Sequence, residues 1–352
     1  MTDACIYYKF DKAGVTVVGT YVDDLLVTGT GESRVNRFFM DMIILDLKDL
    51  GLASTFLGMR VQYVADSGYQ FDQETSIVEL LTRFGLEQAN SVLAPIGSKE
   101  PSPTDVLEVL PPLASQELVV LTPTIANFQS LMGSLLWIAR CTRPDIMFAV
   151  HCATRRSHAP TMVDWKLAKR IARYLSGTRK LKLLMGGGGL RNLPVQSQCY
   201  TDADFAGNKD DRKSVSAAII KVNGMTVGWL CKKQSSVALS TSEAEFVAAS
   251  VGGQELLGIR ELMNELEVGV ELPIWMLIDN QTAIMQIESE SSSAKAKHVD
   301  VRLKFMRDYT SKGIVVPKYV ASGAMLADLM TKALPVPRVR ELREAVGLVK
   351  SE

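Results

Sequence analysis

The chain has 352 residues, of which 47% are hydrophobic and 22% are charged, and its formal net charge at neutral pH is zero. This composition is typical of a soluble globular protein and leaves room for about two domains. The sequence excludes a membrane-spanning protein, because no apolar run is long enough to cross a bilayer and the first residues do not form a signal peptide.

Cysteine and histidine usage limits the chemistry further. The five cysteines are odd in number, scattered, and never arranged as a CxxC pair. This usage indicates reduced thiols inside a cell and argues against a disulfide framework or a zinc site. The three histidines are too few for a metal centre built from histidine.

The first third of the chain predicts short strands and helices. Residues 20–29 (TYVDDLLVTG) place Asp23 and Asp24 in a turn between apolar segments. Paired aspartates also occur in ordinary solvent-exposed turns. Along this third the pattern predicts strands at 5–10 and 15–18, a helix at 32–48, a strand at 56–64 and an amphipathic helix at 76–85.

The middle of the chain is rich in basic residues. Prolines interleaved with Ser, Glu and Asp predict an irregular linker over 95–125, and helices are expected at 128–140 and 163–177. Between Arg140 and Lys182 there are eleven Lys or Arg and two acidic residues. That block fits contact with a polyanion, and it fits a solvated helix face equally well. The basic face of the second helix consists of Lys166, Lys169, Arg170 and Arg173; its apolar face consists of Trp165, Ala168, Ala172 and Leu175.

The glycine run that opens residues 186–196 is interpreted as a flexible linker and as a domain boundary. After it the pattern of elements is β-β-β-α-β-α-α-β-α. Asn223-Gly224 is expected to be a hairpin turn between the second and third of these strands, and Ser242 the N-cap of the long helix.

Four acidic residues lie where this alternation would bring them together. Asp202 is in the first strand, Glu245 in the first turn of the long helix, Asp279 at the C-terminal end of the fourth strand, and Asp328 in the last helix of the core. Strand ends and helix starts along one sheet edge collect polar groups. Carboxylates gathered there repel one another unless Mg²⁺ or Mn²⁺ neutralises them, and two such ions would support phosphodiester hydrolysis. Taken singly, each acid would more often be a cap or a turn residue.

Six strings in this half, in this order, resemble the ribonuclease H domain of copia-type retrotransposons. They are YTDADFAG (200–207), DDRKSVS (210–216), STSEAEFVAAS (240–250), LIDNQTA (277–283), KHVDVR (297–302) and LADLMTK (326–332). The resemblance implies that the four acids bind two catalytic metal ions and that the domain cleaves the RNA strand of RNA–DNA hybrids.

Within the strings some choices stay open. Glu245 is preferred to Glu243, because only Glu245 begins the family pattern of Glu, an apolar residue, any residue and Ala. Asp202 is preferred to Asp204, because it follows the Tyr-Thr pair. His298 would contact the scissile phosphate or shuttle protons, with a capping role as the alternative.

The chain departs from the family pattern at a few positions. Val215 and Ala217 stand where the family tends to have Thr and Gly, and Ala321-Ser322-Gly323 lacks the usual proline. These changes remove no metal ligand. An integrase or transposase of the same fold would use two Asp and a later Glu; here Glu comes second, which favours ribonuclease H.

The N-terminal half resembles the reverse transcriptase of the same elements. The strings are TYVDDLLVTG, KDLG, FLGM, LLTRFG, SLMGSLLWIARCTRPDI and WKLAKRIARYLSGT. The resemblance implies that Asp23 and Asp24 hold polymerase metal ions and that the basic helix faces a duplex backbone. Because only twenty residues precede Tyr21, we expect the palm to be truncated and this chain alone to lack polymerase activity.

The overall expectation is an α/β protein whose ribonuclease H-like domain has a mixed five-stranded sheet flanked by helices. The expected boundaries are 1–94 for a truncated palm, 95–125 for a linker, 126–185 for a helical thumb or connection, 186–196 for a second linker, 197–335 for ribonuclease H and 336–352 for a C-terminal tail. The partner would be an RNA–DNA hybrid or another nucleic acid inside the cell, in a cytoplasmic virus-like particle or the nucleus. The alternative is an inactive relic or a co-opted nucleic-acid-binding protein.

Overall fold

The computed structural model describes residues 2–45, 47–65, 67–97, 108–112, 122–186, 194–208, 210–289 and 297–350, and of residues 297–303 it describes the backbone only. Most of the two expected linkers, 95–125 and 186–196, lies outside these residues. Among the helices within the described ranges, none is both long and apolar enough to span a membrane.

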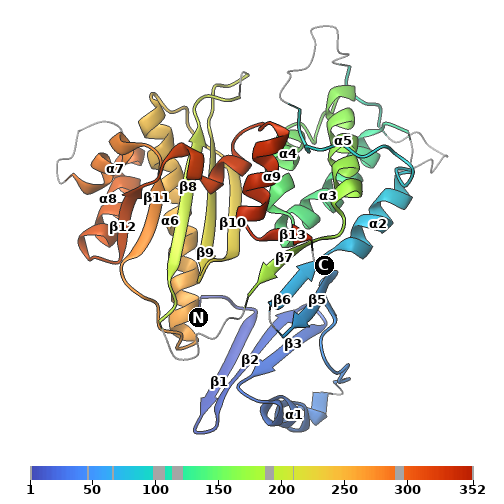
Figure 1. The fold of residues 1–352 in the computed structure, drawn as a ribbon, viewed down its shortest axis with the longest axis vertical. Coiled ribbons are helices and arrows are strands. Elements are labelled where there is room, and N and C mark those ends of the chain that lie inside the picture. The colour runs from blue at the N-terminus through green and yellow to red at the C-terminus, as the bar shows by residue number, and fades with distance from the viewer. Residues whose placement is uncertain are drawn as a thin grey trace.

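The first three strands form a small antiparallel sheet at the bottom of Figure 1. They are β1 (Ile6–Asp11), β2 (Gly14–Tyr21) and β3 (Asp24–Gly29), and the YVDD string is the tight turn that joins β2 to β3. Val22, in this turn, has a φ of 52°, which a β-branched residue rarely adopts. Helix α1 (Glu32–Asp41) ends earlier than the expected helix at 32–48 and is followed by the 3₁₀ turn η1 (Ile43–Leu45).

A second sheet combines strands from both ends of the chain. Its order is β13-β7-β6-β5-β4, and all neighbours are antiparallel. The single strand expected at 56–64 is a hairpin, because Leu57 and Gly58 adopt positive φ and turn the chain between β4 and β5. The strands are β4 (Thr55–Phe56), β5 (Met59–Val64), β6 (Gly68–Asp72), β7 (Leu181–Met185) and β13 (Leu348–Lys350).

The C-terminal segment differs from the expected tail. Residues 336–350 form helix α9 (Val336–Ala345) and strand β13, and β13 pairs with β7, which precedes the expected 197–335 domain in the chain. Leu348 is fully buried there. The expected boundary at 335 therefore separates segments that pack against one another.

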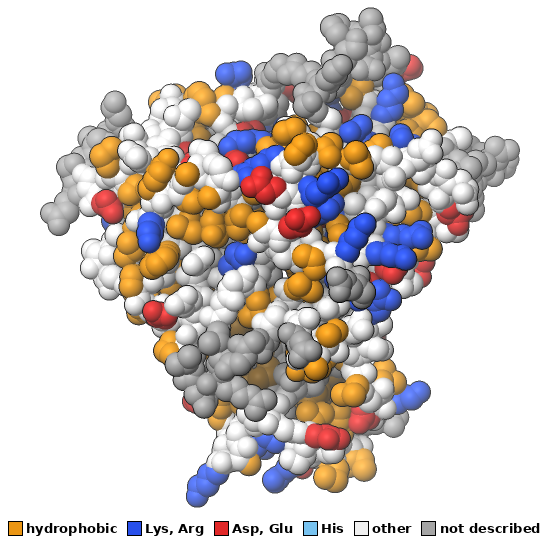
Figure 2. All heavy atoms as spheres, in the orientation of Figure 1, with side chains coloured by type: hydrophobic (Ala, Val, Ile, Leu, Met, Phe, Trp, Pro, Cys, Tyr) orange, Lys and Arg blue, Asp and Glu red, His pale blue; other side chains and the backbone are white. Residues whose placement is uncertain are grey.

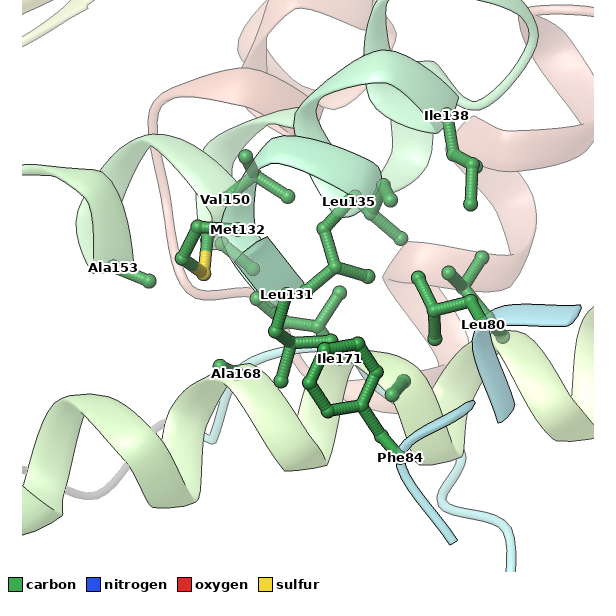
Figure 3. Close-up of a cluster of buried hydrophobic side chains, with 14 of the residues drawn as sticks. Leu80, Phe84, Leu131, Met132, Leu135, Ile138, Val150, Ala153, Ala168 and Ile171 are labelled. Carbon is green, nitrogen blue, oxygen red and sulfur yellow. The ribbon is translucent and has the colours of Figure 1, made fainter. Parts of the chain in front are cut away.

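Four helices and a 3₁₀ turn form a compact unit around one hydrophobic core, shown in Figure 3. The apolar face predicted for residues 163–177 is confirmed, since its four residues are all buried. The elements are α2 (Glu74–Arg83), α3 (Ile125–Cys141), η2 (Pro144–Ile146), α4 (Met147–Thr154) and α5 (Met162–Thr178).

The mixed five-stranded sheet predicted for the C-terminal half is present, which confirms the α/β fold class. Its order is β10-β9-β8-β11-β12; β8, β9 and β10 are antiparallel, whereas β11 is parallel to both β8 and β12. The Asn223-Gly224 turn is confirmed as well. The strands are β8 (Ser197–Asp204), β9 (Val215–Val222), β10 (Met225–Lys233), β11 (Ile274–Ile278) and β12 (Val315–Tyr319).

Helices cover both faces of this sheet (Figure 1). On one face α6 (Thr241–Glu265), α7 (Gln281–Glu288) and α8 (Lys297–Ser311) enclose a core with β8, β9, β11 and β12. On the other face, α9 and the short helix η4 (Leu326–Met330) share a core with β9, β7 and β13. The last core helix is thus a 3₁₀ segment rather than the α-helix expected from its pattern.

A glycine on α6 sets how closely that helix approaches the sheet. A Cβ added at Gly252 would lie 2.6 Å from Cγ2 of Thr201 and 3.0 Å from Cβ of Ala218. Thr201 is the neighbour of Asp202, so the missing side chain allows α6 to lie directly against the strand that carries this acid. The helix begins at an N-cap that differs from the prediction: Ser240, not Ser242, accepts the bond from the amide of Glu243.

Candidate metal centre

The four acids predicted from the sequence come from four separate elements. Asp202 lies near the C-terminal end of β8, and Asp279 directly follows the parallel neighbour β11, so both reach the same sheet edge. Glu245 lies near the start of α6, and Asp328 lies in η4 on the opposite face of the sheet.

Three of these acids meet. One carboxylate oxygen from each of Asp202, Glu245 and Asp279 lies within 4.8 Å of the others. Asp202 is 1% exposed and Glu245 7% exposed, so the negative charges are screened little by water. Asp279 is half-buried. A close group of carboxylates is the ligand type that Mg²⁺ and Mn²⁺ prefer.

Asp328 joins the group through a lysine. Nζ of Lys332 lies 3.2 Å from Oδ1 of Asp202 and also donates to Oδ1 of Asp328. The hydroxyl of Thr331 donates to the other oxygen of Asp202. Neither residue was among the predicted site residues, although both end the string LADLMTK. Their spacing, three and four residues after Asp328, was the available signal, because it places them one helical turn along.

Burial and mutual repulsion change the acidity of the group. Loss of hydration, followed by the charges of Asp202 and Asp279, raises the pKa of Glu245 to about 9. Burial also raises the pKa of Asp202, although Lys332 and Thr331 oppose the effect. One oxygen of Glu245, Oε2, is buried and has no hydrogen-bond partner within the described structure. An unpartnered buried carboxylate oxygen fits a divalent cation, which would supply the missing contact and lower these pKa values.

We expect the metal-free protein to lose stability as the pH rises from about 4.5 to about 9. In this range folded Glu245 keeps a proton that the unfolded chain, with an ordinary pKa of 4.5, has released. Below the range both states are protonated; above it the penalty is constant. Urea unfolding in the presence of EDTA should show this loss, and Glu245→Gln should reduce its slope. An unchanged slope in the variant would contradict the assignment.

The two alternative ligands from the sequence, Glu243 and Asp204, bind backbone amides instead of joining the acidic group. Oε2 of Glu243 accepts a hydrogen bond of 2.8 Å from the amide of Leu239, and its own amide donates to Oγ of the N-cap Ser240, so Glu243 is engaged in holding the start of α6. Oδ1 of Asp204 accepts from the amide of Val215 on the neighbouring strand. Both side chains hold backbone in place, whereas Asp202 and Glu245 point into the acidic group.

Two polar side chains outside the acidic group, Ser322 and Arg338, contact Asp279 and Asp328. Oγ of Ser322 donates to Oδ2 of Asp279 over 2.9 Å, and Arg338 lies 3.8 Å from Oδ2 of Asp328. Arg338 also donates to the carbonyl of Ser322 over 3.3 Å. Ser322 lies in the Ala321-Ser322-Gly323 segment, which lacks the proline that is usual in the family. In this chain the segment supplies a hydrogen-bond donor to Asp279. Over α9, basic and acidic side chains lie side by side in Figure 2.

His298 lies in α8, but its side chain is outside the described residues. Its predicted contact with phosphate, or its capping role, therefore stays a prediction.

Asp23 and Asp24 lie at the exposed β2–β3 hairpin. Across the residues that the structure describes, no third His, Cys, Asp or Glu completes a group of three with them. The hairpin matches the predicted acidic turn between strands. Its role in binding polymerase metal ions stays a prediction.

The predicted basic face of α5 is partly engaged within the protein. Lys169 lies over the ring of Trp165, 5.7 Å from its centre, and Arg173 donates to the carbonyl of Asn90 over 2.6 Å. Arg170 is half-buried and Lys166 is exposed. The contacts of Arg173 and Lys169 show that part of this face packs within the helical unit. Phosphate binding by these four residues stays a prediction.

Comparison with known proteins extends over the whole chain. Residues 1–98 match the family model "Reverse transcriptase (RNA-dependent DNA polymerase)". The chain is 32% identical to the retrovirus-related Pol polyprotein from transposon TNT 1-94 of Nicotiana tabacum, over 99% of this chain and 26% of that protein. It is 29% identical to the Pol polyprotein from transposon RE1 of Arabidopsis thaliana, over 99% of this chain and 23% of that protein. The chain thus spans about a quarter of the length of these curated relatives.

Two solved structures are similar to part of the chain. The N-terminal RNase H domain of rv2228c from Mycobacterium tuberculosis is 11% identical, with 43% of this chain and 98% of that chain covered and a TM-score of 0.29. LC11-RNase H1 in complex with RNA/DNA hybrid is 13% identical, with 39% of this chain and 94% of that chain covered and a TM-score of 0.29.

Proposed function

The chain belongs to the copia-type retrotransposon Pol family, and from this premise we propose that its C-terminal half cleaves the RNA strand of RNA–DNA hybrids with the help of divalent metal ions. The observation that carries the proposal is the close group of Asp202, Glu245 and Asp279 at one edge of the mixed sheet, in which the first two acids are buried and the third is half-buried. Stability alone does not account for three carboxylates held together in this way, because they repel one another.

Asp202, Glu245 and Asp279 would hold Mg²⁺ or Mn²⁺. Such ions make a water molecule more acidic and stabilise charge on the leaving oxygen in phosphodiester hydrolysis. Thr331 and Ser322 fix the carboxylates of Asp202 and Asp279 by donating one hydrogen bond to each. Because Glu245 keeps a proton to about pH 9 in the metal-free protein, it must release that proton when it becomes a ligand.

The proposed substrate class follows from the resemblance to ribonuclease H. A ribonuclease H domain recognises the A-form shape and the 2′-hydroxyl groups of the RNA strand rather than a base sequence. Lys166 and the neighbouring basic side chains of α5 would contribute phosphate contacts that depend on salt concentration. By family, Asp23 and Asp24 would be polymerase metal ligands.

Cleavage of three labelled duplexes of one sequence tests the proposal. With Mg²⁺ or Mn²⁺ present, we expect internal cuts in the RNA strand of the RNA–DNA hybrid, and no cuts in RNA–RNA or DNA–DNA duplexes. EDTA should abolish cleavage. Binding of the hybrid without any metal-dependent cleavage would overturn the proposal and favour a non-catalytic nucleic-acid-binding protein.

A further inference from the structure

A lysine side chain lies between two of the four acids. Nζ of Lys332 contacts Oδ1 of Asp202 at 3.2 Å and also contacts Oδ1 of Asp328. The two acidic side chains are 1% and 10% exposed, whereas the lysine side chain is 41% exposed. The ammonium group therefore contacts two largely buried carboxylates on a side chain that is itself partly exposed to solvent.

The positive charge near the acids is unevenly distributed. Asp202 has both oxygens engaged, one by Lys332 and one by Thr331. Asp328 likewise has Lys332 at one oxygen and Arg338 at 3.8 Å from the other. Within the described part of the chain, neither Glu245 nor Asp279 forms an ion pair with any Lys or Arg. Basic side chains therefore balance the acids on the Asp328 side of the site, whereas the acids on the Glu245 side have no basic partner among the described residues.

We propose that Lys332 takes the place of one divalent ion in the protein without substrate. The protein alone then binds a single ion between Asp202, Glu245 and Asp279, and a second ion enters only after the lysine withdraws from Asp202 and Asp328. This inference rests on the proposed metal-dependent function. It adds a positioning role for Lys332, namely control of how many ions bind before the nucleic acid does.

The chemistry of lysine suits this role. Its ammonium is a compact charge on a flexible four-carbon stem, and the partly exposed side chain can withdraw toward solvent without unfolding of η4. A divalent ion placed between the same two carboxylates would meet the ammonium at close range, and like charges at such distances repel strongly in a buried site. Lysine and the second ion therefore exclude each other.

Manganese binding by the protein without nucleic acid tests the proposal. The bound ions are counted from the electron paramagnetic resonance signal of free Mn²⁺. At Mn²⁺ concentrations just sufficient to fill the first site we expect one ion on the wild-type chain and two on Lys332→Met. The wild type should need about tenfold or more Mn²⁺ to take up the second ion, because the ammonium repels it. Lys332→Arg, which keeps the charge, should bind one ion. Lys312→Met is the matched control, since Lys312 forms an ion pair of the same i, i+4 spacing with Asp308 at an exposed position.

The outcomes separate this inference from the proposed function. One ion on both the wild type and Lys332→Met, with equal affinity, would overturn the inference and leave the metal site standing. No ion on either chain would overturn the metal site and the inference with it.

A second measurement uses the wild-type chain only. Reductive methylation followed by mass spectrometry should find Nζ of Lys332 protected in the metal-free protein and reactive at high Mn²⁺ concentration. Equal reactivity under both conditions would overturn the inference, even if the Lys332 variants failed to fold.

Discussion

Replacing Glu245 with Gln is expected to reduce cleavage of an RNA–DNA hybrid by about 100-fold or more, because even indirect partners of a metal site contribute 10- to 100-fold. The same change should stabilise the metal-free protein at neutral and alkaline pH. Glutamine removes a buried carboxyl whose pKa is raised to about 9, and with it the free-energy cost of holding a proton that the unfolded chain has released. Opposite effects on activity and stability identify a residue that is held for function at a cost in stability.

The measurement combines a single-turnover cleavage assay with urea unfolding in EDTA. Glu243→Gln is the matched control, two residues away on the same helix. This substitution weakens the hydrogen bond that the Glu243 side chain accepts from the amide of Leu239 and should cost about 1 kcal/mol of stability or less. Cleavage by this control should match that of the wild type. Loss of cleavage in Glu243→Gln, with activity retained in Glu245→Gln, would reverse the assignment of the ligand.

Replacing Arg143 with Met is expected to destabilise the protein by about 3–5 kcal/mol, because it leaves the buried carboxylate of Asp145 without its cation. Arg143 is 1% exposed and forms two hydrogen bonds with Asp145, of 2.9 and 2.8 Å. It also donates to the carbonyl and hydroxyl of Thr178 at the end of α5. Tyr174 donates to Asp145 over 2.7 Å and lies 3.4 Å from a nitrogen of Arg343 on α9. This network ties the helical unit to the C-terminal segment.

Urea denaturation provides the measurement, and two further variants interpret it. Arg156→Met removes an exposed ion pair with Asp210 and should cost no more than about 1 kcal/mol. The double variant Arg143→Met/Asp145→Leu removes both buried charges and should recover much of the lost stability, because paired apolar replacements are often neutral. If Arg143→Met cost no more than Arg156→Met, the buried pair would not be important for stability.

The C-terminal half illustrates how far local sequence patterns extend. Alternation and turn residues predicted β8, β9 and β10, and the Asn223-Gly224 turn, because each depends on neighbours along the chain. The pattern failed for η4, which is a 3₁₀ segment: apolar spacing alone does not distinguish a short 3₁₀ run that is fixed by packing from an α-helix. It also failed for β13, since a three-residue strand is too short to show a period and is defined by its partner β7.

The sequence by itself determined the kinds of residue and their order: four acids as Asp, Glu, Asp and Asp, within strings that resemble one family. The choice between Glu243 and Glu245 as the metal ligand depended on the family motif, because both are glutamates in the same helical turn. Only the tertiary structure decided their surroundings, with Glu243 capping α6 and Glu245 facing Asp202 and Asp279. It also brought Lys332 into contact with Asp202, 130 positions away in the chain. Such contacts depend on how β8, α6 and η4 pack, and no local pattern in the chain records that packing.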